Sequence, residues 1–161
     1  MLECPRESKS LIEWIIDNAL TLYTMSENRN DFFVLHGITS SWALSQILPS
    51  VKSEETKLEI LQAFLCDLLA VYISKDRANL NPDYVAGSSE EPDMSWDDLM
   101  AKVLSMQITT EEHRYKLVQV CYESYLRNPE KAALYLKAAL TALDFHFHIA
   151  SMSVSKKLSE E

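Results

Sequence analysis

The chain has 161 residues, of which 47% are hydrophobic and 24% are charged, and these values are ordinary for one globular domain. It contains only two glycines, Gly37 and Gly87, whereas a Rossmann fingerprint needs three close together and a P-loop needs two before its lysine. The formal net charge is −9 and no basic stripe interrupts it, which argues against binding to nucleic acid or to an anionic membrane surface.

Capping signals and apolar spacing predict the first three helices. The first begins near Ser8 or Ser10 and runs to about residue 25, because Ser10 and Glu13 have the spacing of a capping box. The second, residues 31–49, is almost wholly apolar and should end at its proline. The third begins at Ser53. Its apolar positions, which predict packing lengthwise on other helices, are Leu58, Leu61, Leu65, Leu68 and Tyr72.

Residues 79–94 form the one long irregular stretch. The segment NLNPDYVAGSSEEPDM contains two prolines, one glycine and an acidic run, so we predict a loop. Ser95 with Asp98 then predicts the start of a short helix. Thr109 with Glu112 has the same spacing and predicts the start of the next helix.

The run Asn128-Pro129-Glu130 is typical of a helix start, and the last helix should extend to about Leu143. We therefore expect an all-α fold in which about six helices pack as an irregular bundle with one long loop. Residues 1–161 should form a single helical domain, with residues 152–161 as a frayed tail.

The three cysteines, Cys4, Cys66 and Cys121, are widely separated and odd in number. This usage favours reduced thiols rather than a disulfide framework or a zinc site. The N-terminal residues lack the apolar core of a secretory signal. We therefore expect a cytoplasmic protein.

The second helix carries the first candidate site, because a titratable ring lies in an otherwise apolar segment. His36, Thr39 and Ser40 are three and four residues apart, which places them on one helix face. An imidazole next to a hydroxyl in a dry site can act as a general base, or can orient a bound carbonyl or phenol. The alternative is a core histidine bonded to Ser40 or to a backbone carbonyl.

His113 lies in the first turn of its helix, beside Glu111 and Glu112. The sequence is compatible with a side chain that faces a cleft and with one that lies on the surface. A metal site is a further alternative, since Asp144 and His148 are four residues apart on a continuing helix. No Glu-x-x-His pair supports a carboxylate-bridged centre, so we assign no metal ligands.

Other chemistries have less support. The chain has no Gly-x-Ser-x-Gly elbow, which argues against a serine hydrolase of that fold. Its tyrosines are interpreted mostly as core aromatics with a polar tip, and any one of them could donate a hydrogen bond to an aromatic ligand. The tyrosines of the two last helices are Tyr115, Tyr122, Tyr125 and Tyr135.

Two stretches resemble segments of the questin oxidase-like family. FFVLHGITSSWALSQILP resembles the Phe-Phe-x-x-His-x-Val-Thr-Ser-Ser segment of that family. SWDDLMAKVLSMQITTEEHRYKLVQVCYES resembles a later segment, in which a Trp-Asp pair precedes an acidic-His-x-x-Lys-Leu-Val run. The resemblance covers about residues 11–145. Family members are usually longer, so the chain resembles the C-terminal part of a member, either as a truncated gene product or as a short isoform. If the other half supplies essential groups, the chain is expected to be inactive alone.

The resemblance implies a helical oxidoreductase that performs NADPH-dependent Baeyer–Villiger-type oxidation of an aromatic polyketide or related ketone. It implies catalytic positions at His36 and His113, and Thr39 and Ser40 on the same helix face are assigned to substrate binding. The expected cofactor is NADPH and the expected ligand a small aromatic substrate. The alternative is a non-catalytic interaction module, with an apolar face covered by a helical partner or by a second copy of the chain. A helical metal protein is a third reading.

Overall fold

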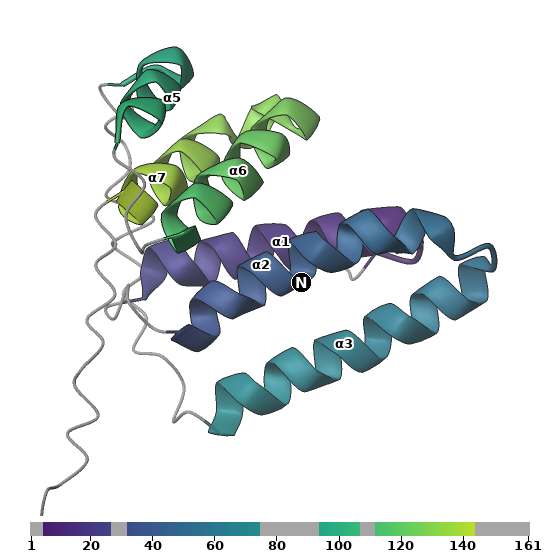
Figure 1. The fold of residues 1–161 in the computed structure, drawn as a ribbon. Coiled ribbons are helices and arrows are strands. Elements are labelled where there is room, and N and C mark those ends of the chain that lie inside the picture. The colour runs from purple at the N-terminus through teal and green to yellow at the C-terminus, as the bar shows by residue number, and fades with distance from the viewer. Residues whose placement is uncertain (1–4, 27–31, 75–93, 107–111, 144–161) are drawn as a thin grey trace, which may run out of the picture.

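The computed structural model describes residues 5–26, 32–74, 94–106 and 112–143 (Figure 1). Within these ranges the chain forms six α-helices and no β-strand, so the predicted all-α fold is confirmed. The predicted tail lies outside the described residues, as does the predicted loop 79–94 apart from its last residue. The helices are α1 (Ser8–Met25), α2 (Phe32–Ile47), α3 (Glu54–Ser74), α5 (Trp96–Ser105), α6 (Glu112–Arg127) and α7 (Ala132–Leu143).

Two of the predicted helix starts are confirmed by their capping hydrogen bonds. Ser95 precedes α5, and its Oγ accepts from the backbone N–H of Asp98 at 3.2 Å while donating to the Asp98 carboxylate at 2.6 Å. Ser53 precedes α3, and its Oγ accepts from the backbone N–H of Thr56 at 3.2 Å. The capping box predicted at Thr109 lies outside the described residues. These caps are local, so short sequence patterns suffice to find them.

The capping box predicted for Ser10 and Glu13 is wrong. Helix α1 begins at Ser8, which leaves Ser10 inside the first turn, and the residue before the helix makes no side-chain cap. The backbone N–H of Ser8 instead donates to the Glu54 carboxylate at 2.7 Å. That hydrogen bond lowers the pKa of Glu54. A side chain from α3 thus satisfies an N–H group that no nearby residue caps.

Both prolines at helix boundaries lie in short 3₁₀ turns. One turn, Leu48–Ser50, follows α2, and the other, Pro129–Lys131, precedes α7. The start predicted at Asn128 is therefore correct in position for the 3₁₀ turn, whereas α7 itself begins at Ala132, and the Asn128 side chain makes no capping hydrogen bond. The N–H of Lys131 donates to the Asn128 carbonyl at 3.2 Å, three residues earlier, which is the spacing of a 3₁₀ turn.

The hydrophobic core lies where α1 packs against α2 and α7, and where α6 packs against α2 and α7. Figure 1 shows α1 and α2 side by side, with the α6–α7 pair on one side of them and α3 on the other. Three alanines of α7 are fully buried, and their small side chains let neighbouring helices approach closely. They are Ala138, Ala139 and Ala142.

Helix α3 packs on α1 and α2 along only part of its surface. Leu61 is fully buried, and Leu68 lies near Gly37 of α2, where an added Cβ would be 3.8 Å from the leucine side chain. In the last turns of α3, Leu69 is 51% exposed and Ile73 is 60% exposed. The predicted lengthwise packing is therefore correct for one face of the helix. Among the described helices, none is long and apolar enough to cross a membrane.

Candidate functional site

The two histidines singled out in the sequence lie next to each other. His36 is in the second turn of α2 and His113 is in the first turn of α6. Their ring centroids are 5.6 Å apart and the ring planes meet at 61°, an edge-to-face arrangement. Both residues are half-buried. Two imidazoles in one partly sheltered place can hold a proton acceptor and a proton donor together.

A second contact joins the same two helices. The Nε1–H of Trp42, on α2, donates to the Glu123 carboxylate, on α6, at 2.6 Å. The other oxygen of Glu123 accepts from the Gln119 amide at 3.0 Å. Because both carboxylate oxygens are engaged, the direction of the Glu123 side chain is set, and with it the placement of α2 on α6. The histidine pair lies on the N-terminal side of this contact on both helices.

The hydroxyl groups predicted to bind substrate turn back to their own helix. The Thr39 hydroxyl donates to the Leu35 carbonyl at 3.4 Å, and the Ser40 hydroxyl donates to the His36 carbonyl. Such bonds to the preceding turn engage the hydroxyl proton and leave oxygen lone pairs as acceptors. Thr39 and Ser40 are half-buried. Their role in substrate binding stays a prediction, as do the catalytic roles of the two histidines.

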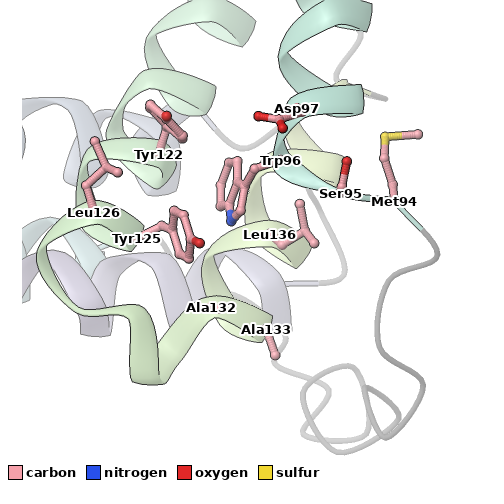
Figure 2. Close-up of a pocket in the computed structure, with 10 residues that line it drawn as sticks. All are labelled: Met94, Ser95, Trp96, Asp97, Tyr122, Tyr125, Leu126, Ala132, Ala133 and Leu136. Atoms are coloured by element: carbon pink, nitrogen blue, oxygen red, sulfur yellow. The ribbon is translucent and has the colours of Figure 1, made fainter.

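A cavity of about 630 Å³ lies elsewhere, between α5, α6 and α7 (Figure 2). Its volume is within the range of about 300–1,000 Å³ that is usual for small-molecule sites. The start of α5 contributes one wall, and the C-terminal half of α6 and the first turns of α7 contribute the others. The lining residues are Met94, Ser95, Trp96, Asp97, Tyr122, Tyr125, Leu126, Ala132, Ala133 and Leu136.

Three aromatic rings form the centre of this lining. Trp96 stacks on Tyr125, with ring centroids 5.1 Å apart and planes at 23°, and its centroid is 5.4 Å from that of Tyr122. The two tyrosine rings are 6.3 Å apart. We define Trp96, Tyr122 and Tyr125 as the aromatic cluster. The sequence alone does not reveal this cluster as a site, because the spacing of the tyrosines on α6 also fits a core stripe and Trp96 comes from another helix.

The aromatic cluster and the histidine pair are separate places on α6. Tyr122 is nine residues beyond His113, which corresponds to about 14 Å along the helix axis at 1.5 Å per residue. A small molecule in contact with both would have to span that length. We therefore treat them as two candidate sites.

NADPH would meet no cationic side chain in the described lining of this cavity. Its phosphates would need lysine or arginine side chains, or a helix N-terminus without competing charge. The charged residue of the described lining is acidic, Asp97. The N-terminal turn of α5, which borders the cavity, carries both Asp97 and Asp98. Two carboxylates there oppose the binding of a polyphosphate.

The described part of the chain contains no group of three or more His, Cys, Asp or Glu residues placed to hold a metal ion. The pair considered in the sequence, Asp144 and His148, lies outside that part. Cys121 is fully buried, and burial raises the pKa of its thiol far above the usual range. Cys66 is exposed. Neither described thiol lines the cavity.

A family model described as questin oxidase-like matches residues 5–121. The match includes both histidines, Thr39, Ser40 and Trp96, and it ends before Tyr122, earlier than the resemblance to residue 145 expected from the sequence. No curated protein matches the chain, and no solved structure does. The family match indicates an oxidoreductase-like function. Since it spans more than half of the sequence, the chain belongs to the questin oxidase-like family.

Proposed function

We propose that this protein is an oxidoreductase that acts on an aromatic polyketide or related ketone at the histidine pair. The observation that carries the proposal is the 5.6 Å separation of the His36 and His113 rings. These rings come from distant parts of the sequence, and both lie within the residues that match the family. A half-buried site with two titratable rings suits proton transfer to and from a substrate oxygen.

The proposed reaction is a Baeyer–Villiger-type oxidation. One oxygen atom of dioxygen enters the bond between the carbonyl carbon and a neighbouring carbon, and the other oxygen atom leaves as water. When bound, NADPH would supply, together with one proton, the two electrons and the two hydrogens of that water. NADPH is included because the chain resembles a family that uses it. The described lining of the cavity on α5 has an acidic rather than a basic side chain, so residues are assigned to the ketone alone.

The two histidines have complementary roles in this proposal. His36 orients the ketone by a hydrogen bond to its oxygen or removes a proton from a phenol group of the substrate. His113 holds or returns the proton from the N-terminal end of α6. Thr39 and Ser40 accept hydrogen bonds from substrate hydroxyl groups through their free lone pairs. The hydrogen bond from Trp42 to Glu123 keeps the two rings together.

The test is an activity assay on the full chain. Purified protein is incubated with questin, NADPH and air, and mass spectrometry follows a product that is one oxygen atom heavier. His36→Gln and His113→Gln should each lower product formation by about 10²-fold or more, the size typical of a lost acid–base group. Gln46→Ala, an exposed position on α2, is the matched control and should keep full activity.

Circular dichroism and thermal unfolding show whether each histidine variant keeps its fold. The proposal is overturned if folded histidine variants form product at the rate of the unchanged protein. It is also overturned if the unchanged protein forms no product and does not consume NADPH above the rate of a protein-free blank.

A second candidate function is that of a non-catalytic interaction module. It is favoured by the exposed apolar residues Leu69 and Ile73 at the end of α3. Such side chains form part of helix-in-groove interfaces, in which an apolar face packs on a helical partner or on a second copy. Light scattering tests the second copy directly. A dimer that Ile73→Glu converts to a monomer would support this function, and a monomer at all concentrations would exclude self-association.

A further inference from the structure

The cavity at the aromatic cluster has a buried donor without an acceptor. The indole Nε1–H of Trp96 is fully covered, and it has no hydrogen-bond partner. A buried donor left unpaired costs about 1–3 kcal/mol, so such groups are rare in folded proteins unless a ligand or water completes them. In Figure 2 the nitrogen edge of Trp96 is directed toward the side of the cavity where Tyr125 and Leu136 lie.

The rest of the lining is suited to a flat ring. Trp96 and Tyr125 stack on each other, and the ring faces that they turn away from one another offer a further stacking surface, which favours an aromatic partner by dispersion and by ring electrostatics. Leu126 and Leu136 add apolar surface from α6 and α7. Ala132 and Ala133, from the first turn of α7, also line the cavity, and their side chains are short.

The lining disfavours anionic ligands because of its charge, and it disfavours ligands that bring only hydrogen-bond donors because its own buried group is a donor. The acidic Asp97 and the formal charge of −9 on the chain both disfavour a carboxylate or phosphate. An organic cation would be attracted to Asp97 and to the ring faces, but a protonated amine brings only donors and leaves the indole N–H unpaired. A neutral carbonyl or ring nitrogen supplies the missing acceptor.

We propose that this cavity is a second ligand site, which binds a flat, uncharged aromatic molecule through stacking on the aromatic cluster and an acceptor atom facing the Trp96 N–H. The site is distinct from the histidine pair, since the two are about 14 Å apart along α6. It therefore does not depend on the proposed reaction. A small shift of the indole on binding is required, because the N–H is covered in the structure.

Isothermal titration calorimetry on the full chain tests this site with three probes of similar size. Chromone is neutral and has a carbonyl acceptor, naphthalene has no acceptor, and chromone-2-carboxylate has the acceptor and a negative charge. We expect chromone to bind about tenfold more tightly than either of the others. Naphthalene lacks the hydrogen bond to the indole, and chromone-2-carboxylate adds a negative charge that the site repels. Chromone binding that is absent, or no tighter than that of naphthalene, overturns the proposal.

Two variants assign the binding to this cavity. Trp96→Phe keeps a ring for stacking but removes the donor, so chromone and naphthalene should bind equally. Ala132→Leu leaves the aromatic cluster unchanged and reduces the space, so both probes should bind at least about tenfold more weakly. If Trp96→Phe does not fold, Ala132→Leu alone decides. Chromone binding that survives Ala132→Leu unchanged places the probe elsewhere and overturns the proposal.

His36→Gln separates this inference from the proposed reaction. The variant should bind chromone as the unchanged protein does, because the histidine pair is remote from the cavity. Loss of chromone binding in folded His36→Gln would show that the probe occupies the histidine site, and the second site would be rejected. Loss of product formation with retained chromone binding would support both proposals.

Discussion

The hydrogen bond between Trp42 and Glu123 should contribute measurably to the packing of α2 on α6. It joins an indole N–H to a carboxylate at 2.6 Å, and both side chains are half-buried. Hydrogen bonds to charged groups contribute about 1.5–3 kcal/mol. Because water reaches part of this pair, we take the lower end of that range, about 1.5 kcal/mol. This value is the expected coupling between the two side chains.

A double-mutant cycle measures that coupling. Trp42→Phe, Glu123→Ala and the double variant are unfolded in urea beside the unchanged protein, and the free energies of unfolding are compared. Trp42→Phe also removes indole surface from the core, but this loss occurs with and without Glu123 and cancels in the cycle. Each single variant should therefore lose the coupling energy together with the free energy of its own other contacts. The double variant should lose less free energy of unfolding than the sum of the two single losses, and the difference is the coupling energy.

The control is Gln119→Ala, which removes the weaker bond to the other oxygen of the same carboxylate. That bond is exposed, so we expect a change within about 0.5 kcal/mol. A coupling of Trp42 with Glu123 below about 0.5 kcal/mol would be within the error of additivity. Such a result would show that this hydrogen bond does not position α2 on α6. The bond would then give no support to the placement of the histidine pair.

Three further predictions concern single positions. Burial, and secondly a hydrogen bond to a carboxylate, raise the pKa of Tyr135 well above its usual range. The unfolded chain then releases this proton at lower pH than the folded chain, so the free energy of unfolding should fall as pH rises above about 10. Urea unfolding should show this fall, and Tyr135→Phe should reduce it; an equal fall in the variant would contradict the assignment. Cys121 is fully buried and Cys66 exposed, so a thiol reagent followed by peptide mass spectrometry should label Cys66 at once and Cys121 only on unfolding. Equal labelling rates would show that the packing around Cys121 opens. Gly37→Ala should raise the free energy of unfolding by up to about 1 kcal/mol, because alanine favours a helix and the added methyl group meets Leu68 at an ordinary contact distance. A lower midpoint in thermal unfolding would show that the helices cannot accommodate that group.

Several features of the fold were predictable because their causes are local. Ser53 and Ser95 each lie three residues before the N–H group that they cap, and Pro129 cannot continue a preceding helix. The failed prediction at Ser10 has a tertiary cause. The N–H of Ser8 is satisfied by a side chain from α3, and no pattern around residue 10 can indicate that partner.

The candidate sites were predictable only in part. A histidine in an apolar segment is visible in the sequence, and the family resemblance selected the same two histidines that the structure brings together. The aromatic cluster was not found, because tyrosines at helical spacing are more often core than site. Only the placement of Trp96 beside them distinguishes the two cases.

By itself, the sequence of this protein determined its helical class, most of its helix ends and its membership of the questin oxidase-like family. Those properties depend on patterns within a few turns, or on residues compared along one chain. The tertiary structure decided that His36 meets His113, that Trp42 on α2 bonds to Glu123 on α6, and that three helices line an open cavity at Trp96. Such contacts depend on how helices cross, and a crossing is the joint result of many side chains packing together rather than a property of any one segment.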